Sequence, residues 1–161
     1  MFETSSKIVD IEKAKGILEE VRIQGKKVVF TNGCFDLVHL GHVDYLEKAR
    51  NLGDFLVVGL NTDASVSSIK GPFRPISPEI SRARVLASMA FIDMVVLFGE
   101  PTPKELIESI KPDILTKGND YTIDTIVGAD FVIARGGHVE TIPLVQGFST
   151  SNFVSRILSN P

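Results

Sequence analysis

Short apolar runs that alternate with helical stretches constrain the fold of this chain more than any other feature. Strands are predicted at residues 27–31, 55–60, 94–98, 113–116 and 139–142, and helices at 43–51, 79–90, 103–110, 125–135 and 150–158. The strand interiors, such as Val-Val-Phe and Leu-Val-Val-Gly-Leu, are continuously apolar, as expected for strands that are covered on both faces. The alternation therefore predicts an α/β fold, with a five-stranded parallel sheet and helices on both faces.

The first 25 residues predict an amphipathic helix that ends at Gly25, a typical C-cap. Its apolar positions recur at helical spacing at Ile11, Ala14, Ile17, Leu18 and Val21. We expect this helix to pack on the domain, and a contribution to a homodimer contact is the alternative. A chain of 161 residues without a repeat or low-complexity linker is predicted to form a single domain over residues 1–161.

Charge and composition narrow the classes of partner. A net charge of −3 argues against nucleic acid as the main partner, because duplex binding needs a clustered basic face. The single cysteine, Cys34, excludes an internal disulfide and is consistent with a reducing cytosol. No apolar run approaches the roughly 18 residues that cross a bilayer, and the N-terminus lacks a signal-peptide pattern. We expect a cytoplasmic enzyme domain with no membrane partner.

The chemistry concentrates in the run Thr31–His42, which joins a predicted strand to a helix. His39 and His42 are three residues apart, so they should lie on one face of the first helical turn. Gly41 between them lets a ligand's phosphates approach the backbone, and a helix N-terminus adds free N–H groups and a positive dipole end. This arrangement suits a nucleoside triphosphate.

The histidine pair has two other interpretations. The histidines could simply cap or pack the helix. They could also bind zinc together with Asp36, but no further cysteine or histidine cluster completes a coordination shell, so no metal site is predicted.

Three polar loops follow predicted strands, at residues 31–42, 117–121 and 143–151. In open α/β sheets such loops meet at the carboxyl edge, where ligands bind. The loop at 117–121 could be a plain turn, since Gly, Asn and Asp favour turns. The hydroxyls at 149–151 could be a plain N-cap, but after a glycine and before a helix they also suit a phosphate nest. The convergence of the three loops favours a nucleotide site.

The run Thr31–His42, with its H-x-G-H motif, resembles the signature of the cytidylyltransferase-like nucleotidyltransferases. The resemblance extends over residues 27–157, and three further stretches carry it, namely 59–66, 113–121 and 147–152. It is strongest to the adenylyltransferase domains of bacterial ADP-heptose synthases. Asn119 departs from a family glycine, but Asn tolerates left-handed backbone angles. Ser151 replaces a threonine and keeps the hydroxyl.

The resemblance implies a Rossmann-like fold and transfer of AMP from ATP to a sugar 1-phosphate, most similar to a heptose phosphate. A sugar-phosphate oxygen attacks the α-phosphorus, pyrophosphate leaves, and no covalent enzyme intermediate forms. His39 and His42 would donate hydrogen bonds to the triphosphate. Lys70 and Arg82 would face the phosphates as further catalytic residues. Mg²⁺ would enter with ATP and screen the β- and γ-phosphates. In the family, ADP-heptose supplies lipopolysaccharide core assembly.

Further residues are implied to bind the substrates. The nucleotide-binding set comprises Thr31, Asn32, Gly33, Phe35, Asp36, Gly41, Lys117, Asp120, Gly147, Ser149, Thr150 and Ser151. Asp36, Asp63 and Lys70 are predicted to contact the acceptor. Arg74 and Arg84 are weaker candidates, and a solvated basic face is the alternative for all the basic residues between 70 and 84. Cys34 is expected to pack beneath the loop without chemistry.

Two other functions share these features. Glycerol-3-phosphate cytidylyltransferase has the same H-x-G-H motif, and base choice would depend on backbone groups near residues 143–147. A non-catalytic nucleotide-binding regulator would be expected to lose a histidine of the motif, and both are present. Family domains are often fused to a sugar kinase. Since this chain begins with Met1 and contains no second domain, we expect it to act after a separate kinase.

Overall fold

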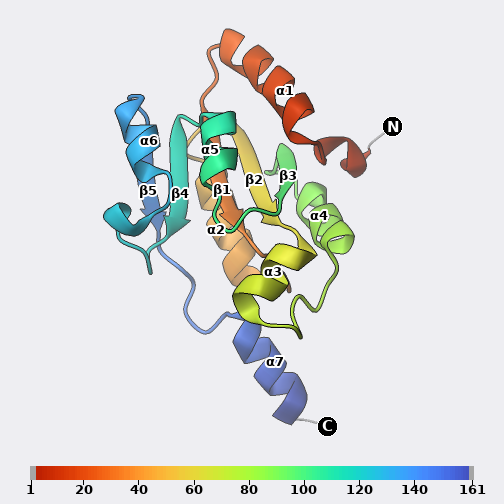
Figure 1. Ribbon diagram of the computed structural model, residues 1–161. Coiled ribbons are helices and arrows are strands. Elements are labelled where there is room, and N and C mark those ends of the chain that lie inside the picture. Colours follow the sequence, from red (N-terminus) through yellow and green to blue (C-terminus); the bar gives the residue numbers. More distant parts are fainter. Residues whose placement is uncertain (1–2, 160–161) are drawn as a thin grey trace.

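A five-stranded, all-parallel sheet forms the centre of the computed structural model, which describes residues 3–159 (Figure 1). The sheet order is β3-β2-β1-β4-β5. The strands are β1 (Val28–Gly33), β2 (Phe55–Asn61), β3 (Met94–Phe98), β4 (Ile114–Gly118) and β5 (His138–Ile142). The predicted α/β class and the parallel sheet are confirmed, because each apolar run forms a strand whose backbone pairs with its neighbours.

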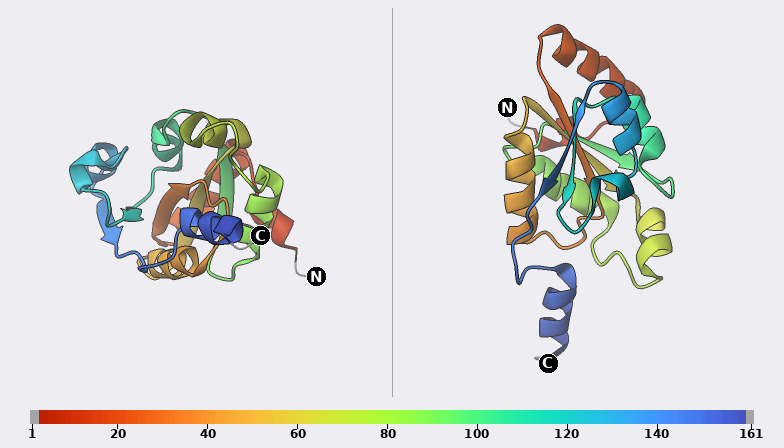
Figure 2. Two further views of the ribbon diagram at one scale, coloured as in Figure 1. Left: turned by 90° about the horizontal axis from the view of Figure 1, so that it is seen from below. Right: turned by 90° about the vertical axis from the view of Figure 1, so that its left-hand side faces the viewer.

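Helices cover both faces of the sheet, as predicted (Figure 2). Alternate residues of each strand point to opposite faces, so Phe30 joins one hydrophobic core and its neighbour Val29 joins the other. The first core packs against α1 (Ile11–Ile23), α5 (Lys104–Ile110) and α6 (Ala129–Ala134), and the second against α2 (Leu40–Arg50) and α4 (Glu79–Ser88). Burial on both faces explains why the strands are continuously apolar in sequence.

Three helices differ from the sequence prediction. The helix α3 (Asp63–Lys70) was not predicted, although Thr62 caps it by accepting a hydrogen bond from the Ser65 amide. The predicted helix at 125–135 is shorter, because a 3-10 turn, η2 (Ile123–Thr125), precedes α6. The helix α2 begins at Leu40, three residues earlier than predicted, so His39 is its N-cap.

The prediction of one helix over residues 1–25 is wrong for the described part of that segment, and Met1 and Phe2 lie outside the described residues. A 3-10 turn, η1 (Thr4–Lys7), is followed by an extended stretch in which Ile8 bridges Val95 of the edge strand β3. The α-helix begins only after Asp10, whose carboxylate accepts a hydrogen bond from the Lys13 amide. The bridge between Ile8 and Val95 holds this stretch extended, and the Asp10 N-cap starts the α-helix at residue 11. The α-helix therefore does not extend further toward the N-terminus. The helix packs against α5 and the sheet as expected, while a role in a dimer contact stays a prediction.

The carboxyl ends of the strands point toward α3 and α7 (Thr150–Ser159), at the end of the molecule away from the free end of α1 (Figures 1 and 2). The helix α7 extends away from the sheet, and none of its described residues is buried. This edge of the sheet is therefore where the loops after β1, β4 and β5 are free to meet. Between residues 3 and 159, none of the helices is long and apolar enough to cross a membrane.

A pair of glycines allows the packing of the sheet to be tested. A Cβ at Gly59 in β2 would lie 2.8 Å from Phe30 Cζ and 3.0 Å from Leu106 Cδ2, whereas one at Gly16 on α1 would meet nothing within 4 Å. We expect Gly59→Ala to lower the free energy of unfolding by about 1–3 kcal/mol through overpacking. The control, Gly16→Ala, should raise it by about 0.5–1 kcal/mol, because alanine is the better residue inside a helix. Urea denaturation measures both, and equal effects of the two variants would contradict the packing described here.

Candidate active site

A cavity of about 540 Å³ opens at the carboxyl edge of the sheet, beside β1 and β4. The chain leaves β1 for α2 on one face and leaves β4 for η2 and α6 on the other, so the strand order reverses between them. Such a switch point is where open α/β sheets bind ligands. The cavity is lined by residues of all three predicted loops, 31–42, 117–121 and 143–151, which brings together segments more than a hundred residues apart in sequence.

Most of the predicted site residues line this cavity. They are Asn32, Gly33, Phe35, Asp36, His39, Gly41, His42, Lys70, Lys117, Asp120, Ser149, Thr150 and Ser151. Thr31, Asp63, Arg82 and Gly147 are not among the lining residues. The side chain of Thr31 is buried and bonds Tyr45 Oη at 2.8 Å, which places it behind the cavity wall.

The two histidines of the H-x-G-H motif lie in contact, although one of them stands just outside the helix. Their rings stack with centroids 3.9 Å apart and an interplanar angle of 24°. His39 is the N-cap of α2 in extended conformation, and His42 lies in the first turn. A Cβ at Gly41 would come within 3.1 Å of the His39 ring, so the glycine lets the ring lie close to the backbone without crowding.

Both histidines are electrostatically suited to be neutral donors. Burial lowers the pKa of His42 to about 4, and the positive charges of His39 and Lys70 act in the same direction, against a hydrogen bond with the Leu37 backbone. Burial also lowers the pKa of His39. At neutral pH each ring therefore offers one N–H donor without carrying a charge.

Three buried polar atoms of cavity residues have no partner in the described part of the chain: Asn32 Oδ1, His39 Nδ1 and His42 Nδ1. A buried polar atom without a hydrogen bond costs about 1–3 kcal/mol. Native proteins keep few such atoms, and those that remain often serve a ligand. Their concentration around one cavity therefore favours a binding site for a polar molecule.

Lys117 places a positive charge in the cavity, beside the neutral histidines. Its Nζ donates to the Asn32 carbonyl at 3.2 Å and lies 5.6 Å from the centroid of the Tyr121 ring. Burial lowers the pKa of Lys117 to about 8, although Asp120 and Cys34 act in the opposite direction. The lysine is thus a cation at neutral pH that is close to losing its proton.

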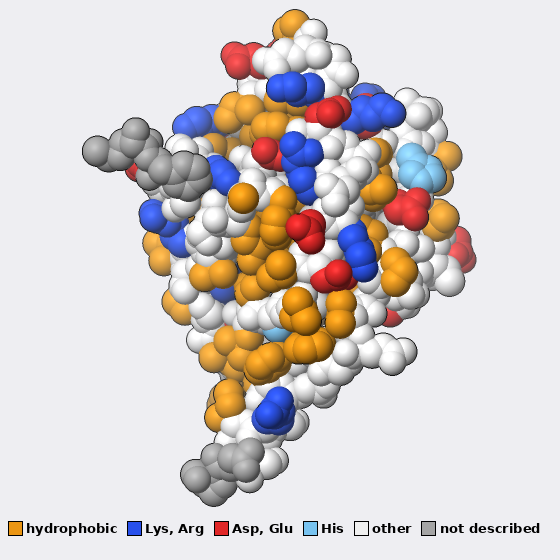
Figure 3. Space-filling view, turned by 180° about the vertical axis from the view of Figure 1, so that it is seen from behind, with side chains coloured by type: hydrophobic (Ala, Val, Ile, Leu, Met, Phe, Trp, Pro, Cys, Tyr) orange, Lys and Arg blue, Asp and Glu red, His pale blue; other side chains and the backbone are white. Residues whose placement is uncertain are grey.

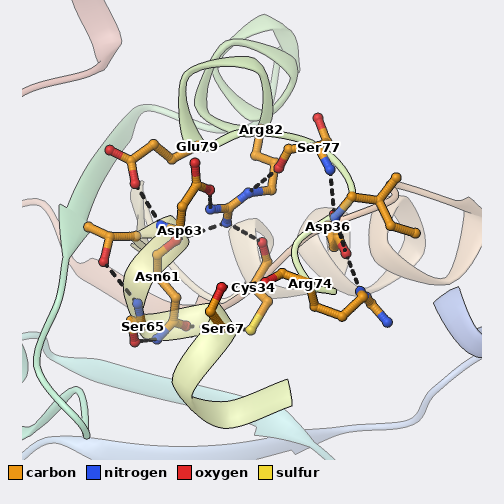
Figure 4. Close-up of polar contacts among 12 residues, drawn as sticks. Cys34, Asp36, Asn61, Asp63, Ser65, Ser67, Arg74, Ser77, Glu79 and Arg82 are labelled. Carbon is orange, nitrogen blue, oxygen red and sulfur yellow. Dashed lines mark hydrogen bonds and ion pairs between the residues drawn. The ribbon is translucent and has the colours of Figure 1, made fainter. Parts of the chain in front are cut away.

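Asp36 lines the cavity, but its carboxylate is already engaged. It accepts hydrogen bonds from Arg74 Nε at 2.6 Å, the Ile76 amide at 2.8 Å and the Ser77 amide at 2.9 Å (Figure 4). These bonds fasten residues 71–78, the loop between α3 and α4, to the loop after β1. Both carboxylate oxygens accept bonds in this conformation, so its predicted contact with acceptor hydroxyls would require this clamp to open. The preceding residue, Phe35, has a φ of 43°, an uncommon conformation for a side-chain-bearing residue and one typical of functional loops.

Arg82 is fully buried behind the cavity wall and does not face it. Its guanidinium donates to the carbonyls of Ser77 at 2.9 Å, Cys34 at 2.7 Å and Asn61 at 2.8 Å, and to Asp63 Oδ1 at 2.7 Å (Figure 4). These partners come from four different segments around the site. The arrangement makes Arg82 and Asp63 supports of the wall, and a direct contact of either with phosphate or acceptor stays a prediction.

Sequence reasoning missed several lining residues, which are Cys34, Tyr45, Asn61, Ile69, Gly118, Tyr121, Leu144, Val145 and Phe148. Tyr45 lies three residues after His42, so helical spacing could have placed it on the same face. Asn61 ends β2 at the same edge of the sheet at which Gly33 ends β1. Cys34 faces the cavity, rather than packing beneath the loop as expected, and its thiol lies 3.9 Å from Asn61 Oδ1.

The clamp at Asp36 generates a prediction about pH. Burial alone would raise the pKa of Asp36, but the amides of Ser77 and Ile76 and the Arg74 guanidinium outweigh it, so the pKa lies below the ordinary value of 3.8. The clamp should therefore stabilise the fold fully above about pH 4 and lose this contribution as the pH falls below that value. We expect Asp36→Asn to cost about 1–3 kcal/mol at pH 7 in urea denaturation, and the difference from the wild type to shrink near pH 3.

The matched control is Asp44→Asn, because Asp44 pairs with Lys48 in an i,i+4 contact at 2.7 Å on the surface of α2. Such pairs contribute about 0.3–0.5 kcal/mol. An Asp36→Asn effect no larger than this control at pH 7 would show that the clamp does not stabilise the fold.

Comparison with known proteins places the chain in a family. The model of the cytidylyltransferase-like family matches residues 30–145. Two relatives, each named bifunctional protein HldE, come from Syntrophotalea carbinolica and Magnetococcus marinus. They are 57% and 58% identical over 98% and 97% of this chain, which spans 32% of the length of each. The chain thus corresponds to about a third of these relatives.

Solved structures share the fold of this chain. A lipopolysaccharide core biosynthesis protein from Thermoplasma volcanium is 31% identical with a TM-score of 0.60, over 75% of this chain and 98% of that protein. Pantothenate synthetase from Thermus thermophilus has a TM-score of 0.67 over 91% of this chain and 67% of that protein, and its 15% identity shows a shared fold alone. The Rossmann-like architecture implied by the sequence is confirmed. By its family match and its close relatives, the chain belongs to the cytidylyltransferase-like family.

Proposed function

We propose that this chain is an adenylyltransferase that transfers AMP from ATP to a sugar 1-phosphate, D-glycero-D-manno-heptose 1-phosphate, and releases pyrophosphate. The observation that carries the proposal is the convergence of three loops on one cavity that holds neutral imidazoles, lysines and unpartnered buried polar atoms. The N–H groups of the imidazoles and lysines are the donors that a triphosphate needs, since its oxygens only accept hydrogen bonds.

The triphosphate would lie between the N-termini of α2 and α7. His39 and His42 stand at the first of these, and the hydroxyl-bearing residues 149–151 at the second. Ser149 Oγ already caps α7 by accepting from the Asn152 amide at 3.1 Å, which leaves the remaining first-turn groups for the ligand. Helix N-termini favour anions through their free N–H groups and dipoles. Lys70 and Lys117 would supply the positive charge.

The nucleoside would occupy the side of the cavity next to β4 and β5. Tyr121, Leu144 and Val145 line this side and offer aromatic and aliphatic surface for a base. Asp120 lies beside them and would accept hydrogen bonds from the ribose hydroxyls. The acceptor would then lie on the β2 side, near Asn61 and Lys70.

In the proposed reaction an oxygen of the sugar phosphate forms a bond to the α-phosphorus of ATP, and the bond to the bridging oxygen of the β-phosphate breaks. Its electron pair leaves with pyrophosphate. Catalysis then consists of positioning and of hydrogen bonds to the charge that develops on the phosphoryl oxygens. Because the imidazoles are neutral and already in place, they need no reorganisation as charge develops.

Mg²⁺ is proposed as part of the substrate, bound to the triphosphate oxygens, since Mg²⁺ is usually held by substrate phosphates and few carboxylates. Within residues 3–159 there is no cluster of three or more His, Cys, Asp or Glu side chains that could hold a metal ion. Two carboxylates line the cavity within the described residues, Asp36 and Asp120. Asp36 is engaged in its clamp, whereas Asp120 is not.

The relatives support the acceptor and the pathway. The relatives named bifunctional protein HldE match over nearly all of this chain, and a similar solved structure is described as a lipopolysaccharide core biosynthesis protein. We propose that this chain performs one of the two functions of such relatives and that a sugar kinase supplies its substrate. A cytoplasmic location follows from the proposal, because ATP is its substrate.

The first test is a pyrophosphate-release assay with ATP or CTP and a panel of sugar phosphates, with the product identified by mass. We expect release with ATP and heptose 1-phosphate and formation of the ADP-sugar. Activity with CTP and glycerol 3-phosphate alone would replace the proposal by its cytidylyltransferase alternative.

The histidine pair offers a matched control in the same assay. His42→Ala should lower kcat by roughly 100- to 1000-fold, the usual effect of removing one donor that stabilises developing charge. His138→Ala should leave kcat unchanged, because His138 is an exposed residue at the start of the edge strand β5 and lies outside the cavity. Full activity of His42→Ala would contradict the proposed mechanism.

Lys117 gives the activity a characteristic pH dependence. The value of kcat/KM for ATP reports on the free enzyme, so it should fall above about pH 8, where Lys117 loses its proton and its attraction for phosphate. Lys117→Arg should move this fall to higher pH, because arginine stays charged. Lys117→Met should abolish the fall and lower kcat/KM at pH 7 by roughly 10- to 100-fold. A wild-type profile that is flat to pH 9.5 would exclude Lys117 as a charged phosphate ligand.

A further inference from the structure

The imidazole of His39 is held without a hydrogen bond. Its Nδ1 is buried and unpartnered, and the described residues offer no hydrogen bond to the ring. A histidine that acts on a ligand is normally oriented through its second nitrogen by a carboxylate or a carbonyl. Packing must therefore orient this ring.

Four aromatic rings around His39 contact one another in succession. Phe35 lies against His42 with centroids 5.2 Å apart, His42 stacks on His39, and His39 stacks on Phe153 at 5.8 Å. The planes of His39 and Phe153 are nearly parallel, at 8°. The imidazole therefore contacts the rings of both His42 and Phe153, next to the backbone of Gly41.

Phe153 comes from α7, which otherwise extends away from the sheet (Figures 1 and 2). Seen from behind, hydrophobic side chains cover the lower part of the molecule and continue onto this helix (Figure 3). The Phe153 amide donates to the Ser149 carbonyl at 3.2 Å, which places Phe153 in the first turn of α7 together with the cavity-lining hydroxyl residues. The ring contact thus joins α7 to the histidine pair at the mouth of the cavity.

We propose that Phe153 is a positioning residue for His39, and that its flat ring holds the imidazole plane in the orientation that serves the triphosphate. The proposal rests on the proposed adenylyl transfer. Phe153 itself is not among the residues that line the cavity, so it acts through His39 and not on the substrate. Because the same turn carries residues 149–151, the orientation of His39 is tied to the position of the second phosphate-facing helix terminus.

The test compares three substitutions at this position with one control. Phe153→Tyr keeps a flat ring, and the phenol oxygen can reach solvent because Phe153 is 38% exposed. Phe153→Leu keeps apolar volume without a flat face, and Phe153→Ala removes both. The control is Ile157→Ala, one turn further along α7, where the side chain is 66% exposed.

We expect Phe153→Leu and Phe153→Ala to lower kcat by roughly 10- to 100-fold with little change in KM for ATP, because a misplaced donor weakens the transition state more than binding. Phe153→Tyr and Ile157→Ala should retain kcat within about twofold. A kcat of Phe153→Leu equal to that of the wild type would overturn the proposal, because an apolar side chain without a flat ring would then be enough to position His39.

An NMR titration of the imidazole signals supplies a readout that does not need activity. The chain has three histidines, so His39 can be assigned by a His39→Asn variant, with His138 on the distant edge strand as internal reference. Removing Phe153 exposes the His39 ring, so the pKa of His39 should rise toward its ordinary value in Phe153→Ala and stay low in Phe153→Tyr. The titration must also take His42 into account, because the charges of His39 and His42 are coupled and Lys70 acts on His42.

Unchanged His39 titration in Phe153→Ala would overturn the positioning role. If the wild type forms no ADP-sugar although the His39 signal responds to Phe153 as expected, the proposed reaction fails and the ring contact stands. Thermal unfolding of each variant, compared with Ile157→Ala, separates both results from a loss of the fold.

Discussion

Arg82 carries its charge into the protein interior, and its hydrogen bonds decide where several segments of the cavity wall lie. A buried guanidinium is costly unless its N–H groups find partners. Here they bond to the carbonyls of Cys34, Asn61 and Ser77 and to the carboxylate of Asp63. The loop after β1, the end of β2, the start of α3 and the loop before α4 are therefore held against one side chain. The shape of the cavity on the β2 side depends on this cluster.

With the wall fixed in this way, the cavity can hold polar groups that are not paired within the protein. The amide oxygen of Asn32 and the Nδ1 atoms of both histidines stay without partners among the described residues. Burial keeps the imidazoles neutral, so they repel neither each other nor nearby Lys70 and can stack at 3.9 Å. Unpaired atoms destabilise the fold, and the stability elsewhere in the sheet and in the Asp36 clamp offsets that cost. The site is prepared for a polar ligand before the ligand arrives.

The sheet could be predicted because its signal is local. A strand buried on both faces must be apolar along its length, and the run Met94–Phe98 was located to the residue. The N-terminal segment could not be predicted in the same way. Its apolar positions fit a helix, but Ile8 forms a bridge to Val95, a residue far away in the chain. The start of α2 was also missed, since the helix begins at Leu40 directly after His39, its N-cap in extended conformation.

The sequence by itself determined the fold class, the three loops that meet at the sheet edge, and most of the residues that line the cavity. The fold class and the loops follow from hydrophobic pattern and from the rule that parallel strands present their carboxyl ends at one edge, whereas most of the individual residues are implied by the resemblance of their motifs to the family. Only the tertiary structure decided which charged groups are free to meet a ligand. Asp36 is committed to partners about 40 residues away in sequence and Arg82 to partners up to 48 residues away, whereas Lys70 and Lys117 face the cavity. The sequence does not distinguish a charged side chain that forms hydrogen bonds within the protein from one that is available to a ligand. The internal partners come from distant segments that only folding brings into contact.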